Sequence, residues 1–230
     1  MRVAFSPDWF ASADVLIEIF SFIVLMLFFI FALKSYKLNK NKNALYLGIG
    51  FLLIAIAEIS TILTKLVLYY DFFFAQAVGQ MVITYKVVRS VDIFYYIGSF
   101  LHKFLTLAGL YVIYRLPWKK TSFSDVFLAF YFLVLSAYFG LDVYYLFHIT
   151  VVIFSAVITR KYYILYKKNK LSNTQVLRNA FGLLTVSHLI FMLSNLEIMY
   201  VIGQTVQLIS YIFLLALMIK IFWYNKKEYG

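Results

Sequence analysis

Several polar or ionisable side chains stand inside long apolar runs of this sequence, where they could do chemistry. They are Glu18, Glu58, Lys65, His102, Lys103, His148, His188, Asn195 and Glu197. Such groups are costly inside a bilayer, so they mark ligand, ion or redox sites, or else they pair with one another. We take all of them as candidate ligand- or ion-binding residues. The sequence contains no recognisable hydrolase motif, and no catalytic residue is predicted.

Two pairs of opposite charge are predicted at matching depth in the membrane. With a rise of about 1.5 Å per helical residue, Glu18 and Lys65 lie equally far below the outer surface on the first and second apolar runs. Glu58 and Lys103 both fall near the midplane on consecutive runs. Either these are ion pairs that only shield charge from lipid, or they line a cavity that opens outward.

The three histidines allow a cofactor but do not require one. His102 and His188 both fall near the midplane, and two histidines at one depth can bind a b-type haem. The alternative is a set of neutral rings that are hydrogen-bonded to hydroxyls such as Ser99 or Ser187. His148 lies nearer the outer surface, and no carboxylate at a recognisable spacing completes a zinc site. The cofactor stays open, with haem b as one option and no metal-ion site predicted.

Composition sets the elements that must position these residues. The chain has 230 residues, of which 64% are hydrophobic and 13% are charged, and this is the composition of a membrane protein. About 20 apolar residues cross the hydrocarbon layer as a helix. We therefore predict an all-α, multi-pass protein of the cell membrane, built as one seven-helix domain over residues 1–230. No room remains for a nucleic-acid-binding domain.

The predicted spans follow the apolar runs and the basic clusters between them. They lie at about 12–33, 44–70, 91–114, 125–139, 143–166, 176–199 and 201–223. Residues 125–159 are too long for one span, and basic residues flank them at both ends, so a hairpin with its turn at 140–142 is expected. A connecting segment of about twenty residues is expected between the second and third spans. A tight turn near Gly203 is expected between the last two.

Charge gives the orientation. Sixteen of the 21 Lys and Arg residues fall on one side of this arrangement, and Arg2, Lys86 and Arg89 fall on the other. Positive residues concentrate on the cytoplasmic side, so the N-terminus is predicted outside and the C-terminus in the cytoplasm. The same cations predict contacts with anionic lipids.

Aromatic residues gather at the predicted outer ends of the spans. They form the groups 69–74, 94–96 and 144–145. Such groups are typical of the aromatic belt at a membrane interface. If they surround a cavity instead, they suit a flat or cationic ligand.

Seven helices in this orientation resemble the architecture of rhodopsins, G-protein-coupled receptors and the input domains of some sensor kinases. Arg89-Ser-Val-Asp92, with Lys103 eleven residues later, also resembles the third helix of microbial rhodopsins. That family holds retinal on a lysine midway along its last helix. The only lysine of the corresponding run here is Lys220, at its cytoplasmic end, so a retinal Schiff base is not expected.

Three functions follow from these features. The first is a receptor-like or sensory bundle that binds a small or lipidic ligand from its outer half and acts through a separate protein partner. Its basic cytoplasmic segment from the end of the fifth span to Arg178 would be the docking surface. The alternatives are a cytochrome-b-like redox subunit that uses His102 and His188, and a transport or assembly component of a membrane complex.

Overall fold

The computed structural model describes residues 6–7, 9–78, 82–116, 122–194 and 196–228, and within 68–78, 82–92 and 221–228 it describes the helical backbone alone. These residues form seven helices and no strand. The helices are α1 (Ala11–Asn39), α2 (Lys42–Val78), α3 (Val82–Tyr114), α4 (Phe123–Asp142), α5 (Tyr144–Asn169), α6 (Ser172–Phe191) and α7 (Glu197–Glu228). The all-helical prediction is confirmed.

Six of these helices are long and apolar enough to cross a membrane. They are α1, the Lys42–Val67 part of α2, the Ile93–Tyr114 part of α3, α4, α5 and the Glu197–Lys220 part of α7. The remaining helix, α6, carries Arg178, Asn179 and several hydroxyl residues, which lower its hydropathy. The chain is therefore a helical bundle suited to a multi-pass membrane protein.

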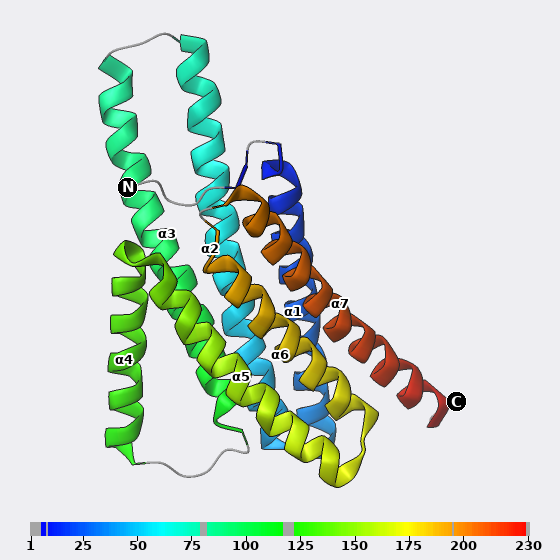
Figure 1. Ribbon diagram of the computed structural model, residues 1–230. Coiled ribbons are helices and arrows are strands. Elements are labelled where there is room, and N and C mark those ends of the chain that lie inside the picture. The colour runs from blue at the N-terminus through cyan, green and yellow to red at the C-terminus, as the bar shows by residue number, and fades with distance from the viewer. Residues whose placement is uncertain (1–5, 8, 79–81, 117–121, 195, 229–230) are drawn as a thin grey trace.

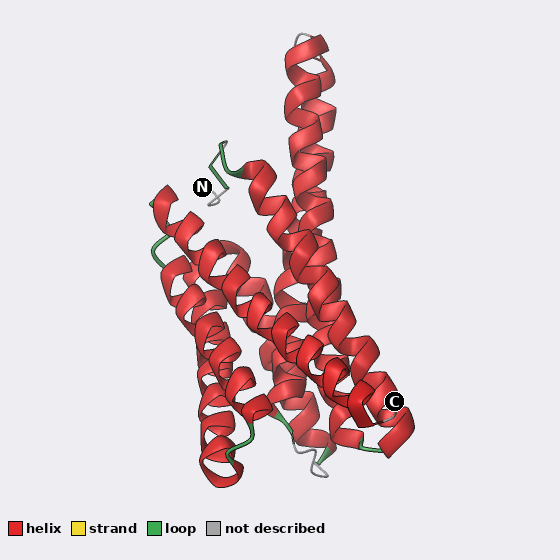
Figure 2. Cartoon of the chain, turned by 90° about the vertical axis from the view of Figure 1, so that its right-hand side faces the viewer, coloured by secondary structure: helices red, strands yellow, loops and turns green. Residues whose placement is uncertain are grey.

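The helices form a ring with one member outside it. Each helix packs on its neighbours in sequence, α7 packs back on α1, and α3 contacts α5 directly. Helix α4 contacts α3 and α5, so it lies against the outside of that junction (Figure 1). The hairpin of α2 and α3 extends well past the other helix ends in both views (Figures 1 and 2).

Two of the predicted connections are wrong and one is confirmed. The hairpin within 125–159 is present, but its turn is at Val143 and not at the expected 140–142, because α4 continues to Asp142 and α5 begins at Tyr144. The segment expected to connect the second and third spans is instead helical up to Val78 and again from Val82. Helix α6 ends at Phe191 and α7 begins at Glu197, so the last turn lies before Gly203, which is inside α7.

The position of Gly203 inside a helix has a packing reason. A Cβ atom at Gly203 would lie 2.7 Å from Cε1 of Phe191, so only glycine lets that ring approach the α7 backbone. Phe191 is buried and contacts the ring of Tyr200 at a centroid distance of 5.7 Å. The glycine therefore marks close contact between the ends of α6 and α7, where the sequence suggested a turn.

Lysines in the left-handed conformation end two helices. Lys40 after α1 has a φ of 51° and Lys170 after α5 has a φ of 49°. Their amides donate to the carbonyls of Tyr36 and Tyr166 at 2.8 and 2.7 Å. This arrangement satisfies carbonyls that the helix end leaves free, and it turns the chain into α2 and α6.

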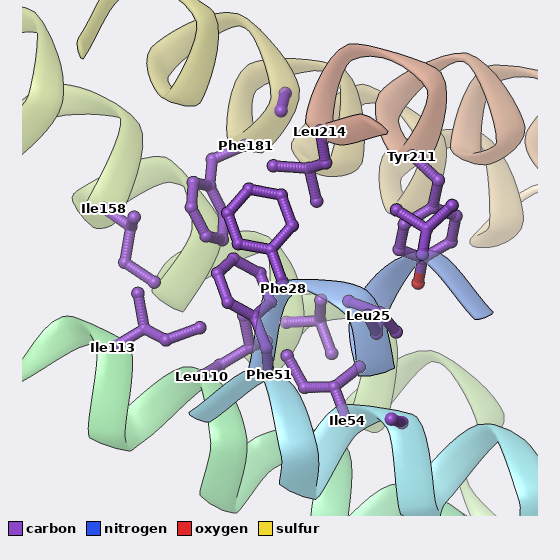
Figure 3. Close-up of a cluster of buried hydrophobic side chains, with 14 of the residues drawn as sticks. Leu25, Phe28, Phe51, Ile54, Leu110, Ile113, Ile158, Phe181, Tyr211 and Leu214 are labelled. Atoms are coloured by element: carbon purple, nitrogen blue, oxygen red, sulfur yellow. The ribbon is translucent and has the colours of Figure 1, made fainter. Parts of the chain in front are cut away.

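The main hydrophobic core lies nearer the Lys42 end of α2 than its Val78 end. Phe51 is at its centre, with ring centroids 4.7 Å from Phe28 and 6.3 Å from Phe181 (Figure 3). Helices α2 and α3 approach closely there, because a Cβ atom on Gly109 would lie 2.6 Å from the carbonyl oxygen of Gly50.

Candidate functional site

A cavity of about 210 Å³ lies inside the ring of helices. Its described lining comes from the segment before α1 and from α1, α2, α3, α5, α6 and α7, and none comes from α4. The ionisable side chains that line it are Glu18, Glu58, Lys65, His102, Lys103, His148 and His188. The helix ring thus brings together all but two of the residues singled out from the sequence.

Lys65 is the centre of a buried charge cluster between α1, α2 and α7. Its ammonium group forms ion pairs with the carboxylates of both Asp14 and Glu18, and it donates to the hydroxyl of Tyr200 at 3.4 Å. Tyr200 in turn donates to Asp14 Oδ2 at 2.8 Å and accepts from Gln204 Nε2 at 3.1 Å. The predicted Glu18–Lys65 pair is therefore confirmed.

Asp14 is the member of this cluster that sequence reasoning missed. It stands at the start of the first apolar run, where an acidic residue is ordinarily an interface residue. In the structure it is fully buried. The signal that could have found it is the spacing of Asp14 and Glu18, because residues four apart lie on the same face of a helix.

Glu58 and Lys103 both line the cavity, but the predicted ion pair between them is wrong. Glu58 is buried and accepts a hydrogen bond from the Tyr211 hydroxyl on α7 at 3.1 Å. Lys103 is also buried and donates to Ser99 Oγ, one turn earlier on α3, at 2.8 Å. Both charges therefore remain beside the cavity with neutral partners.

The histidines pair differently from the haem arrangement. His148 and His188 contact each other, with their Nδ1 atoms 2.9 Å apart, whereas His102 Nδ1 lies 2.6 Å from Thr61 Oγ1. The ring of Phe147 lies beside both groups, with centroid distances of 5.8 Å to His102 and 6.0 Å to His188. A hydroxyl partner for the histidines was expected from residues such as Ser99 or Ser187. His102 has a hydroxyl partner, but it is Thr61.

The hydroxyls named as partners for histidine are used elsewhere. Ser99 accepts from Lys103, and Ser187 donates to the carbonyl oxygen of Gly203 at 3.1 Å. Within the part of the chain that the structure describes, no group of three His, Asp or Glu side chains could hold a metal ion.

The remaining predicted residues lie away from the cavity or outside the part of the chain that the structure describes. Glu197 is exposed in the first turn of α7 and does not line the cavity. Asn195 lies outside the described residues. The side chains of Arg89 and Asp92, which carry the resemblance to microbial rhodopsins, are likewise outside the description, although α3 includes both positions.

The outer aromatic residues divide into two sets. Phe94, Tyr96 and Tyr145 are more than half exposed, as expected for side chains that face lipid. Tyr95 and Tyr144, their neighbours in sequence, line the cavity. They join rings from the other helices there, so the cavity has aromatic walls as well as charges. The group at 69–74 lies where only backbone is described.

Comparison of the chain with protein-family models, curated proteins and solved structures finds no match. The site itself must therefore support any conclusion about function. It combines buried charges of both signs, two sets of hydrogen-bonded imidazoles and aromatic surfaces around one cavity. Such a space suits reversible binding of a small polar molecule with an apolar part.

Proposed function

We propose that this chain is a seven-span, receptor-like protein of the cell membrane, which binds a small ligand in the central cavity and acts through a separate protein partner. The observation that carries the proposal is the cavity of about 210 Å³ with buried charges in its wall. An engineered cavity of about 150 Å³ is enough to hold benzene. A structural bundle would gain stability by filling such a space with apolar side chains.

The shape of the bundle supports the seventh crossing. Helix α6 has 20 residues, which at about 1.5 Å per residue reach the roughly 30 Å of a hydrocarbon layer. It packs along α5 and α7. Its polar residues Thr174, Ser187 and His188 are buried inside the bundle and need no contact with lipid, so a lower hydropathy is compatible with a crossing. The N-terminus outside and the C-terminus in the cytoplasm then follow from the positions of the basic residues.

The end of the bundle that holds the α5–α6 turn supports a partner on the cytoplasmic side. Lys167 and Arg178 lie over the ring of Tyr163, at 4.9 and 5.9 Å from its centroid, and Arg178 also lies 5.2 Å from the Tyr166 ring centroid. These contacts hold cationic groups together on one surface. We propose that this surface contacts anionic lipid headgroups and an acidic segment of the partner.

The absence of cysteine from the sequence allows a direct test of the cavity. Leu184 lines the cavity, whereas Val186, two residues further along α6, is 46% exposed on the outer surface of the bundle. In the full-length protein in its membrane, Leu184→Cys should react with a water-soluble methanethiosulfonate added from outside. Val186→Cys is the matched control, because a thiol in lipid stays protonated and unreactive. Equal labelling rates would refute an accessible cavity and the proposed function with it.

A further inference from the structure

Two charges of opposite sign face the cavity without meeting. Lys65 forms ion pairs with two carboxylates, Asp14 and Glu18, so its ammonium group is already engaged within the protein, and that cluster keeps one formal negative charge. Glu58 on α2 and Lys103 on α3 lie outside it, and no ion pair joins them. An unbalanced charge at membrane depth is costly, so a partner that supplies both opposite charges would be strongly favoured.

Lys103 has unused capacity to bind an anionic group. An ammonium group has three donors, and within the described part of the chain Lys103 Nζ donates one hydrogen bond, to Ser99. Thr106, one turn further along the same face of α3, lines the cavity with a buried hydroxyl that has no hydrogen-bond partner in the described part of the chain. A carboxylate-like group could accept from both residues.

Glu58 has unused capacity to bind a cationic group. The residue is only 4% exposed, and among the described residues its carboxylate accepts one hydrogen bond, from Tyr211. Gln207 Nε2 donates to the Tyr211 hydroxyl at 3.2 Å, and this orients the phenol toward the carboxylate. A carboxylate can accept about four hydrogen bonds, so an ammonium group can still bind there.

We propose that the cavity recognises a small zwitterion, with Lys103 and Thr106 binding its anionic group, Glu58 binding its ammonium group, and the aromatic walls holding its apolar part. This inference rests on the proposed function and specifies the ligand class. Phe147, Phe191, Tyr144 and Tyr211 supply ring surfaces for the apolar part. Phenol and phenyl faces also attract cations, which favours an ammonium group over a neutral amine.

Three related compounds test the charge requirement. L-phenylalanine carries both charges, 3-phenylpropionate lacks the ammonium group, and phenethylamine lacks the carboxylate. Each is titrated into the full-length protein in lipid nanodiscs, with binding measured by calorimetry and by the shift in thermal stability. We expect L-phenylalanine to bind at least about tenfold more tightly than either half-compound, because each half-compound lacks one charge-assisted contact; tenfold corresponds to about 1.4 kcal/mol.

Substitutions assign each charge. Lys103→Met should abolish the preference for L-phenylalanine over phenethylamine, and Glu58→Gln should abolish its preference over 3-phenylpropionate. Lys103→Arg should retain the preference for L-phenylalanine over phenethylamine, because arginine keeps the positive charge. Lys220→Met and Glu197→Gln, which remove exposed charges outside the cavity lining, should leave both unchanged.

The outcomes separate this inference from the proposed function. If Leu184→Cys is labelled but the unsubstituted protein binds none of the three compounds, or binds a half-compound as tightly as L-phenylalanine, the zwitterion is refuted while the cavity stands. If Leu184→Cys is not labelled, both fail. The comparison of the three compounds on the unsubstituted protein shows whether the cavity prefers a zwitterion, even where a variant does not fold.

Discussion

The Nδ1 atoms of His148 on α5 and His188 on α6 lie 2.9 Å apart, so one ring must donate a proton that the other accepts. Both side chains are buried and no carboxylate bonds to either among the described residues. The two imidazoles therefore depend on each other for hydrogen bonding. This mutual dependence ties the first turns of α5 to the last turn of α6 at the wall of the cavity.

Replacing either histidine by leucine should destabilise the protein by about 1–3 kcal/mol, because the remaining ring keeps a buried polar nitrogen without its partner. The double replacement should cost less than the sum of the two. Unfolding of the purified protein in mixed micelles, analysed as a double-mutant cycle, measures the difference. Additive effects would show that the rings do not interact.

Removing the ammonium group of the charge cluster should have a larger effect. Lys65→Met leaves the carboxylates of Asp14 and Glu18 buried without a cation, so a loss of about 3–5 kcal/mol is expected. The triple variant Asp14→Asn, Glu18→Gln, Lys65→Met removes all three charges and should recover most of the loss. The same unfolding assay compares them, and a triple variant no more stable than Lys65→Met would contradict this account.

Two glycines provide a matched test of helix packing. A Cβ atom on Gly109 would meet the Gly50 carbonyl oxygen and Ile54 Cγ1, each at 2.6 Å, whereas one on Gly182 would have its nearest neighbour at 3.7 Å. Gly109→Ala should therefore cost about 1–3 kcal/mol through overpacking. Gly182→Ala should be neutral or slightly stabilising. Equal thermal stabilities of the two variants would rule out the close approach of α2 and α3.

Single cysteines test the seven-span orientation. Asn173 at the start of α6 and Glu197 at the start of α7 are both exposed, and α6 lies between them. A membrane-impermeant maleimide on intact cells should label Glu197→Cys at once and Asn173→Cys only after permeabilisation. Labelling of both from the same side would mean that α6 does not cross, and the count would fall to six.

The sequence predicted how deep each residue lies in the membrane better than it predicted which way each side chain points around its helix. Glu18 and Lys65 were matched because helical rise fixes how deep each residue lies. Glu58 and Lys103 were matched by the same rule, yet they do not pair. Depth does not say which way a side chain points, and in lipid the outer face of a helix is as apolar as its core face.

Close backbone contacts were also hidden from sequence reasoning. Gly50 and Gly109 form no GxxxG motif, because that motif requires both glycines on one helix. Their contact arises between α2 and α3, once those helices are placed side by side. The last turn was misplaced for a related reason, since Gly203 serves packing against Phe191 and not chain reversal.

Helix α4 contributes no side chain to the described lining of the cavity, and most of its large apolar residues are exposed. It approaches the site at Gly140, where an added Cβ would lie 3.4 Å from Lys103 Cδ. Under the proposed function, the rest of α4 is therefore free to vary with the thickness and composition of the bilayer without altering the surface that meets the ligand. Adaptation to the membrane and adaptation to the ligand would then fall on different helices.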